Sequence, residues 1–537
     1  MTSWVSRGGV ARRAAGGAAI AASLAAVITR GRTAEGAARR LVFVPHAMPD
    51  SLDPVATPTT PVRTAALAIY ETLYGTDESL NPMPQMVLRH RVEDGGRDWV
   101  FQLRPGLMFH DGAAVTARDC VASLRRWMRR DVIGLTLADR LAAMEAVDDT
   151  TLSVRLKKPL PSLLHMLAKS QPSPPVIMPA RLADSDPAKP VNEVIGSGPF
   201  RLEASSWQPG TSFGLVRFDK YLPRAEASSF TGGRRLAQLD RIFVRLSKDP
   251  MQELRDGTVD WVEWMPAGQP AGVKDEPGVI ITRLDEFGYY AQLRLNHGWG
   301  PTANPGIRQA ILAAIDQTAV MEAVFGAESR QYKTPAGLFT AGSIFASDAG
   351  TDRIGAKRPP HTIRAMLKDA GYKGEPLILL KPEDDPVHAH LTSAVAEELK
   401  QSGLKVQERR IDQRGLAHPR DKHPAPEGGA WSAFCESAPG PDHIDPITIQ
   451  AAAGKSAAPA GWAAWPDDPK AVRLRDSWID TADLRARRVI AGQLQEQLFT
   501  TAAFVPLGQW FPASGLRLTL SGQQKGPFPV FWELTNA

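Results

Sequence analysis

The chain has 537 residues, more than a single hydrophobic core holds, since cores stop growing at roughly 250–300 residues. Apolar residues make up 43% and charged residues 23%, which excludes a disordered or fibrous chain. The first 38 residues carry most of the formal net charge of +5, so the remainder has no basic excess that would suit nucleic acid or an anionic membrane. We therefore expect a globular protein of two or three domains.

Residues 1–38 are typical of an export signal. Arg7, Arg12 and Arg13 precede a weakly apolar stretch at 14–28, and small residues follow it. About 15 apolar residues are too few to cross a bilayer as a helix, which takes about 20. The Arg12-Arg13 pair leaves the twin-arginine export route open beside the general one. An uncleaved anchor or a misassigned start is the alternative interpretation.

The cysteines and histidines suggest neither a lipid anchor nor a metal site. Cys120 and Cys435 both lie far from the leader, so we expect a periplasmic protein that is not a lipoprotein. Both thiols are predicted to be buried and free, with a disulfide as the alternative. No Cys/His spacing suits zinc. His388 and His390 stand two residues apart and would point to different sides of a helix.

The first half of the chain alternates strand and helix patterns. The expected elements are a strand at 41–44, a helix from Pro61, strands at 99–104 and 151–156, a proline-rich loop at 159–190 and a strand at 242–246. Thr116 and Asp119 have the spacing of a capping box at the start of a helix. The arginines of that helix are predicted to form a solvated face: Arg125, Arg126, Arg129 and Arg130.

The second half has its own α/β pattern. The expected elements are a strand at 289–295, a helix that begins at Asn304-Pro305, a strand at 377–380, a helix through Leu391, Val395 and Leu399, and a strand from Leu404. The last three form a strand–helix–strand unit, which predicts parallel pairing. Residues 415–470 are rich in Pro, Gly and Ala and are expected to be mostly loop. A helix at 481–499 and a strand at 503–507 follow.

Five stretches of the chain match, in order, the motifs of a known family. They are Ser51-Leu52-Asp53-Pro54, Trp99 to Gly112 with Val115 to Asp119, Gly196-Ser197-Gly198-Pro199-Phe200, Asn296 with 307–316, and Lys368-Asp369-Ala370-Gly371-Tyr372. On these motifs the chain resembles the family 5 extracytoplasmic solute-binding proteins, the dipeptide- and oligopeptide-binding group of ABC importers. The resemblance runs from residue 41 to the C-terminus. It departs at Arg89-His90, where the family has an apolar residue and a tryptophan.

The resemblance implies an α/β fold class, the bilobal periplasmic-binding-protein fold of the large peptide-binding type. Its two α/β lobes are joined by a hinge, and an extra subdomain is inserted. The implied division is residues 39–74, 190–285 and 505–537 for lobe I, 75–189 for subdomain II and 286–504 for lobe III. Hinge crossings are expected near 286–292 and 500–508. Closure of lobe III onto lobe I would bury the ligand.

The resemblance also implies where a ligand would bind. A peptide buried between lobes keeps a charged amine, which needs a carboxylate partner. In the peptide-binding relatives an aspartate in an Asp-x-x-(Asp/Glu)-Pro motif meets that amine, and Asp442-His443-Ile444-Asp445-Pro446 matches the motif. Asp442 is thus the predicted amine partner, with a surface Asx-turn as the alternative. The Gly-Trp pair found upstream in those relatives is replaced here by residues 434–441.

Further candidate contacts come from three other places. Met48 and Ser51 lie in the first loop, Tyr289 and Tyr290 near the hinge, and Trp431 is a candidate pocket wall. Ordinary strand packing is the alternative for the two tyrosines. No catalytic residue, metal ligand, cofactor or partner for a peptide carboxylate is predicted.

The function implied is that of the periplasmic substrate-binding component of an ABC transporter. It would capture short peptides as a monomer and deliver them to permease subunits in the inner membrane, without enzymatic activity. One alternative keeps this role with a nickel complex, an opine, glutathione or a sugar as ligand. The other is a secreted hydrolase, but the sequence has neither a nucleophile elbow nor paired carboxylates at strand ends.

Overall fold

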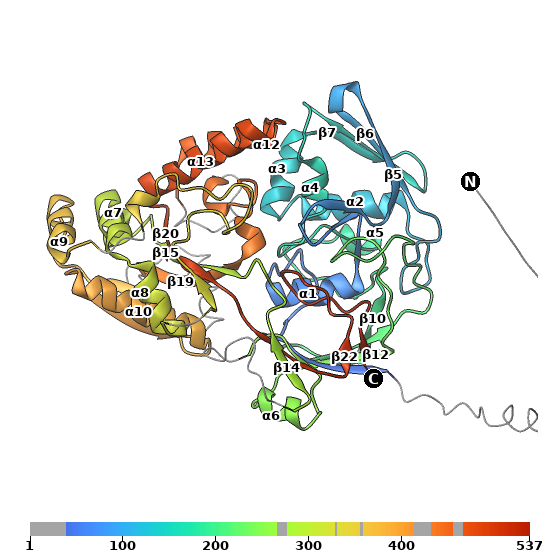
Figure 1. Ribbon diagram of the computed structural model, residues 1–537. Helices are drawn as coiled ribbons and strands as arrows, with labels where there is room; N and C mark the ends of the chain where they lie inside the picture. The colour runs from blue at the N-terminus through green and yellow to red at the C-terminus, as the bar shows by residue number, and fades with distance from the viewer. Residues whose placement is uncertain are drawn as a thin grey trace, which may run out of the picture.

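The structure, a computed structural model, describes residues 39–265, 277–327, 330–354, 358–412, 431–454 and 466–536. Three large sheets and the helices around them form a mixed α/β molecule (Figure 1), which confirms the predicted fold class. The predicted export signal at 1–38 lies outside the described residues. Within them, no helix has the length and apolar character needed to cross a membrane.

Lobe I is built on a seven-stranded sheet with the order β10-β11-β12-β1-β13-β21-β14. The strands are β1 (Arg40–Val44), β10 (Phe200–Gln208), β11 (Ser212–Arg217), β12 (Arg241–Arg245), β13 (Trp261–Val262), β14 (Val279–Thr282) and β21 (Ser514–Arg517). Strand β1 pairs in parallel with β12 and β13. Its Phe43 lies at the centre of an aromatic core, with ring centroids 5.3 Å from Trp261 and 5.2 Å from Phe531.

Helix α1 (Thr60–Ile69) is held by the glycine motif at 196–200. Gly198 N donates to Ile69 O over 2.8 Å, and a Cβ on Gly196 would lie 2.1 Å from the same oxygen. Only glycine permits so close an approach. His110 binds both glycines, because its Nδ1 accepts from Gly196 N and its Nε2 donates to Gly198 O. Two motifs of the resemblance therefore fix the position of α1.

Subdomain II contains a four-stranded sheet with the order β5-β6-β8-β7. Its elements are β5 (Val87–Glu93), β6 (Asp98–Leu103), α2 (Ala117–Trp127), α3 (Val132–Arg140), β7 (Leu141–Ala146), β8 (Thr151–Leu156), α4 (Leu163–Leu167) and α5 (Ala180–Ala183). The capping box predicted for Thr116 and Asp119 is confirmed at the start of α2.

The prediction of a solvated arginine face on α2 is wrong for Arg126. Its side chain is fully buried, and Nη2 lies 2.7 Å from Asp53 Oδ2 in the first loop. The guanidinium also donates to the carbonyl oxygens of Ser185 and Lys189. Because the helix packs between the first loop and the 185–189 segment, one arginine of the group turns inward while Arg125 and Arg129 stay exposed.

Lobe III is built on a six-stranded sheet with the order β16-β20-β15-β19-β17-β18. The strands are β15 (Tyr289–Leu295), β16 (Tyr332–Lys333), β17 (Leu377–Pro382), β18 (Val406–Ile411), β19 (Ala433–Pro439) and β20 (Phe504–Trp510). The predicted strand–helix–strand unit is confirmed, since β17 and β18 pair in parallel with Leu377 opposite Val406. Its helix is α10 (Pro386–Gln401).

Strand β19 lies within residues 415–470, which were expected to be mostly loop and of which the structure describes 431–454 and 466–470. It pairs with β15 on one side and β17 on the other, so it occupies the middle of the sheet. Ala433, Phe434 and Cys435 are buried there. The strand has only seven residues, and the Pro- and Gly-rich sequence around it predicts loop. Cys435, like Cys120, is free and buried, as predicted.

Further helices cover the lobe III sheet. They are α7 (Pro305–Ala314), α8 (Gln317–Phe325), α9 (Pro360–Asp369), α12 (Pro469–Asp480) and α13 (Leu484–Thr500). Asn304 accepts from Gly306 N and Ile307 N and so caps α7, as predicted. Lobe I carries the short helix α6 (Pro250–Arg255). Helices α9 and α10 lie at the far end of lobe III from lobe I in Figure 1.

Two segments connect lobe I to lobe III. Residues 283–288 lead from β14 to β15, and residues 511–513 lead from β20 back to β21. The second crossing lies later than the expected 500–508, because β20 continues to Trp510, which pairs with Tyr289. The division of the chain into lobes remains a proposal. The sheet pairing supports it if the second crossing is placed at 511–513.

Charged side chains join subdomain II to lobe III. Arg140 Nη2 lies 3.1 Å from Asp476 Oδ1, and Arg140 Nε lies 3.4 Å from Asp480 Oδ1. Lys158 Nζ lies 2.5 Å from Asp480 Oδ2. Nearer the hinge, Gln171 Nε2 donates to the carbonyl oxygen of Pro441. These contacts hold the two parts of the molecule together.

We expect Asp480→Ala to loosen this contact, because Asp480 binds two cations. Exposed ion pairs contribute about 0.2–1 kcal/mol each. The fraction of molecules in which subdomain II contacts lobe III should therefore fall several-fold at low salt, and this fraction should depend less on added salt than it does in the wild type. Distances between spin labels on α5 and α13 would measure it. Asp139→Ala is the control, since that side chain is 83% exposed and 4.0 Å from Arg140. An unchanged distance distribution in Asp480→Ala would remove the ion pairs from the closing contact.

Candidate ligand-binding site

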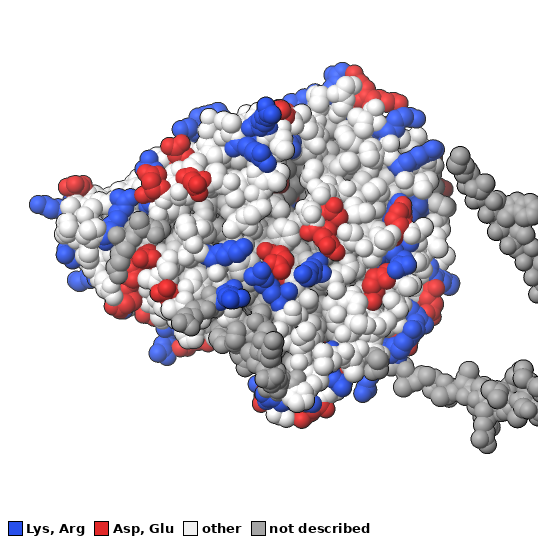
Figure 2. Space-filling model, in the orientation of Figure 1, with Lys and Arg blue, Asp and Glu red and all other residues white. Residues whose placement is uncertain are grey.

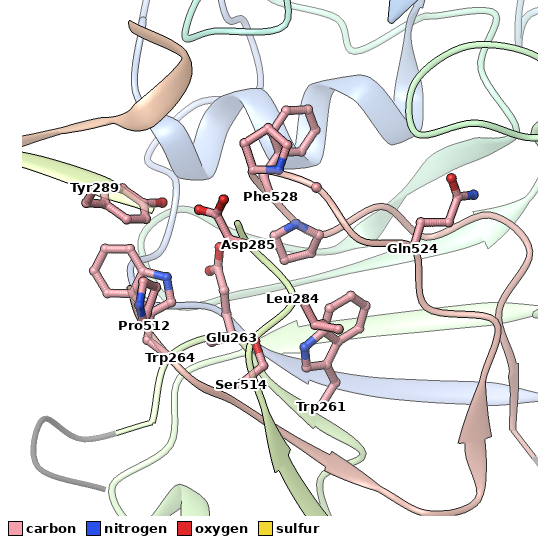
Figure 3. Close-up of a pocket in the computed structure, with 13 residues that line it drawn as sticks. Trp261, Glu263, Trp264, Leu284, Asp285, Tyr289, Pro512, Ser514, Gln524 and Phe528 are labelled. Carbon is pink, nitrogen blue, oxygen red and sulfur yellow. Dashed lines mark hydrogen bonds between the residues drawn. The ribbon is translucent and has the colours of Figure 1, made fainter. Parts of the chain in front are cut away.

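A pocket lies beside the two hinge crossings, with about 360 Å³ of empty space, part of it open to solvent. Lobe I contributes Trp261, Glu263 and Trp264 to its wall, and the first crossing contributes Leu284 and Asp285. The C-terminal segment closes another side with Gln524, Pro527, Phe528 and Pro529. Figure 3 shows the Tyr289 hydroxyl and the carboxylates of Asp285 and Glu263 directed toward one another. The pocket thus combines apolar walls with a small number of polar groups, as ligand sites do.

Glu263 is fixed by His46. The carboxylate Oε2 accepts from His46 N over 2.9 Å and lies 2.7 Å from His46 Nδ1. His46 Nε2 lies 3.1 Å from Thr60 Oγ1, at the start of α1. Burial raises the pKa of Glu263, but the contacts with His46 outweigh it and hold the pKa below its usual value. Glu263 is therefore an ionised, already paired carboxylate.

Asp285 stands on the first crossing and is only half paired. Its Oδ1 accepts from Phe287 N and Gly288 N over 2.8 and 2.9 Å. Its buried Oδ2 has no hydrogen-bond partner within the described part of the chain. Burial raises the pKa of Asp285 to about 7. A cation brought to Oδ2 would restore the ionised form.

Asp442 lies in the 3-10 turn η4 (Gly440–His443), directly after β19. Its Oδ1 is enclosed and has no hydrogen-bond partner among the residues that the structure describes. Burial raises its pKa to about 7, against the opposing effect of Lys169 and Arg63. Lys169 itself is bonded to Asp131. Asp442 is thus a second buried carboxylate to which a cationic group could bind.

Arg63 is a functional candidate that the sequence analysis missed. It lies on α1, is 1% exposed, and its Cζ lies 3.8 Å from the ring centroid of Phe528 on the pocket wall. Its Nε and Nη2 have no hydrogen-bond partner among the described residues. Burial lowers its pKa, while the charges of Asp442, Glu263 and Asp285 raise it. The available signal was one arginine in a helix whose other residues are apolar, small or proline.

Aromatic rings span the two lobes beside the pocket. Trp264, two residues after β13, has its ring centroid 4.7 Å from that of Tyr289 and 5.2 Å from that of Trp510. The His46 ring stacks on the Trp264 ring, with the two centroids 4.0 Å apart. Trp510 Nε1 donates to Ser437 Oγ, which is also 3.0 Å from His388 Nε2. These contacts connect lobe I to the lobe III sheet at the hinge.

Four predicted contacts lie away from the pocket wall, and their roles stay predictions. Tyr290 is fully buried in lobe III, where its ring stacks on His443 and its hydroxyl donates to Gly337 O. Trp431 packs with Leu380 and Phe434 in a separate cluster. Met48 packs against the lobe I core, and Ser51 Oγ accepts from Asp53 N within the first loop. Of the predicted residues, the structure brings only Asp442 and Tyr289 next to Arg63.

Two lobes connected by two crossings, with half-paired buried charges beside a pocket at the hinge, define a two-lobed ligand-binding protein. The model of the bacterial extracellular solute-binding proteins, family 5, matches residues 81–472. A relative from Sinorhizobium fredii (strain NBRC 101917 / NGR234), named "Probable peptide ABC transporter periplasmic-binding protein y4tO", is 31% identical over 492 residues, 90% of this chain and 91% of that protein. The chain therefore belongs to family 5 of the bacterial extracellular solute-binding proteins.

More distant relatives share the fold. A glutathione-binding protein of Pectobacterium atrosepticum is 26% identical over 369 residues, 67% of either chain. The solved structure of Helicobacter pylori DppA in complex with the peptide STSA has a TM-score of 0.78 at 18% identity, covering 93% of this chain and 98% of that one. That of AgaA with agropinic acid, from A. tumefaciens R10, has a TM-score of 0.77 at 21% identity, covering 93% and 99%.

Proposed function

We propose that this protein captures short peptides between its two lobes and delivers them to the permease subunits of an ABC importer in the inner membrane. The observation that carries this proposal is Asp442, a buried carboxylate in the motif at which peptide-binding relatives hold the amine, whose Oδ1 has no hydrogen-bond partner among the described residues. A buried ammonium is stable only beside such a carboxylate. The name of the relative at 31% identity supports a peptide ligand.

The rest of the role follows from the same proposal. The protein works as a monomer in the periplasm, which it reaches through the export signal at 1–38. On the face that Figure 2 shows, acidic and basic side chains are interspersed, which suits a soluble carrier better than a nucleic-acid-binding protein.

We propose no enzymatic role. Among the described residues, Asp385, His388 and Ser437 form an arrangement that resembles a catalytic triad, in which His388 Nδ1 lies 2.6 Å from Asp385 Oδ2. Asp385 also caps α10 by accepting from His388 N, and Ser437 also accepts from Trp510. These bonds attach the N-terminus of α10 to the lobe III sheet, which accounts for the arrangement without chemistry.

A second candidate keeps the transport role with a non-peptide ligand. It is favoured by the segment before Asp442, Phe434 to Pro441, which lacks the Gly-Trp pair of the peptide-binding relatives. The relatives named for glutathione and the structure holding agropinic acid fit this candidate.

Native mass spectrometry of the gently purified protein, before and after denaturation, tests the two candidates. We expect a set of retained masses that fit short peptides, and less retention by Asp442→Asn purified in the same way. One single non-peptide mass would favour the second candidate and leave the transport role in place.

A further inference from the structure

Buried groups of opposite charge lie close to the pocket, and some of their atoms have no partner in the part of the chain that the structure describes. Four of these buried atoms have no hydrogen-bond partner in the described residues. Two are the donors Nε and Nη2 of Arg63, and two are the acceptors Asp285 Oδ2 and Asp442 Oδ1. Buried polar groups are almost always bonded, and leaving one unbonded costs roughly 1–3 kcal/mol. Unpaired groups at several neighbouring positions therefore point to a ligand rather than to a local packing defect.

Arg63 has the chemistry of a carboxylate-binding residue. A guanidinium presents two parallel N–H donors that match the two oxygens of a carboxylate. Its flat face is already occupied by the ring of Phe528, at 3.8 Å, so its edge is the part that can bind a ligand. The carboxylate Glu263, which could have neutralised it, is bound to His46 instead.

Helix α1 makes this position rigid. The glycine motif at 196–198 holds its C-terminal end, and Arg63 N donates to Thr59 O in its first turn. A binding group on a well-packed helix is held more precisely than one on a loop. Arg63 thus belongs to lobe I, whereas Asp442 belongs to lobe III, so a ligand bound by both would connect the lobes.

We infer that Arg63 binds the carboxylate of the ligand while Asp442 and Asp285 bind its amine, which restricts the ligand to a compact zwitterion the size of a dipeptide. This inference rests on the proposed function and adds the ligand class to it. Arg63 lies close enough to Asp442 and Asp285 for the charges of both carboxylates to act on the guanidinium. Since both charged ends of the ligand must bind within this cluster, a longer peptide would leave one of them unmatched.

The test compares peptides that differ only at the carboxylate. An equimolar mixture of dipeptides and a matching mixture of their C-terminal amides are offered to the wild-type protein, Arg63→Met, Arg63→Lys and the control Arg125→Met, which changes an exposed arginine on α2. Native mass spectrometry reads which peptides are retained, and circular dichroism confirms that each variant is folded.

We expect the wild type and the control to prefer the free acids by about 10- to 100-fold, as a charge-assisted pair implies. Arg63→Met should bind acids and amides equally, and Arg63→Lys should keep part of the preference because it keeps the charge without the fork. Equal retention of acids and amides by the wild type would overturn the inference without any variant and leave peptide binding intact. Retention of neither mixture would overturn peptide binding itself, and this inference with it.

Discussion

Asp442→Asn is expected to lower the affinity for a peptide with a free amine by about 2–5 kcal/mol, which is roughly 30-fold or more. The substitution keeps the shape of the side chain and removes the charge that meets the ammonium. Isothermal titration with a dipeptide would measure the loss. Asp445→Asn is the matched control, because Asp445 Oδ1 accepts from Ile447 N and Thr448 N in the same turn and serves the backbone. An affinity unchanged in Asp442→Asn would exclude Asp442 from the site.

The same residue predicts how binding depends on pH. In the unligated protein the pKa of Asp442 is raised to about 7, so its carboxyl adds stability below its usual pKa and loses that contribution as the pH rises through 7. An ammonium ligand stabilises the ionised form, so affinity should fall as the pH is lowered through 7. The neighbouring charges are Lys169, Arg63, Asp131 and Glu436. The pKa of Asp285 is also raised to about 7. The affinity of Asp442→Asn should therefore still depend on pH, but less than that of the wild type.

Asp53→Ala is expected to destabilise the protein by about 3–5 kcal/mol, the cost of leaving a buried charge without its partner. Asp53 is 1% exposed and Arg126 fully buried, and the carboxylate also accepts from Val55 N and Val191 N. Its loss would detach the first loop from both α2 and the 185–191 segment. Urea unfolding followed by circular dichroism would measure the change in free energy of unfolding.

Two comparisons make the Asp53 prediction specific. The double variant Asp53→Leu with Arg126→Met should lose less stability than the sum of the single variants, because no buried charge is left unpaired. Glu93→Ala, which removes a carboxylate 53% exposed in its pair with Arg91, should change the free energy by less than about 1 kcal/mol. An equally small loss in Asp53→Ala would show that the buried pair contributes little.

Local signals predicted much of the fold. The capping box at Thr116, the cap at Asn304 and the strand–helix–strand unit around Leu391 depend on residues close in sequence, and all three are confirmed. Strand β19 and the burial of Arg126 depend on partners far away in the chain. Composition and periodicity do not reveal such distant partners. The sequence therefore predicted loop where β19 lies and solvent exposure for Arg126.

The site was predicted less completely for the same reason. Asp442 was reached through a motif, whereas Arg63 and Asp285 stand in no motif and become candidates only because the fold buries them together. The pair Tyr289-Tyr290 illustrates a finer limit. Alternation along a strand places neighbouring side chains on opposite faces, but only the packing decides which face meets the pocket. In the structure, Tyr289 lines the pocket and Tyr290 packs in the core of lobe III.

The edge-to-face contact between Trp264 and Trp510 provides the molecule with a built-in optical reporter. The two indoles belong to different lobes, and their centroids are 5.2 Å apart with planes inclined at 79°. A rotation of one lobe about the crossings that separates the two rings would change their exposure to water. Tryptophan emission would then shift when the lobes part, and a wild-type molecule could signal its own opening and closing without an attached dye.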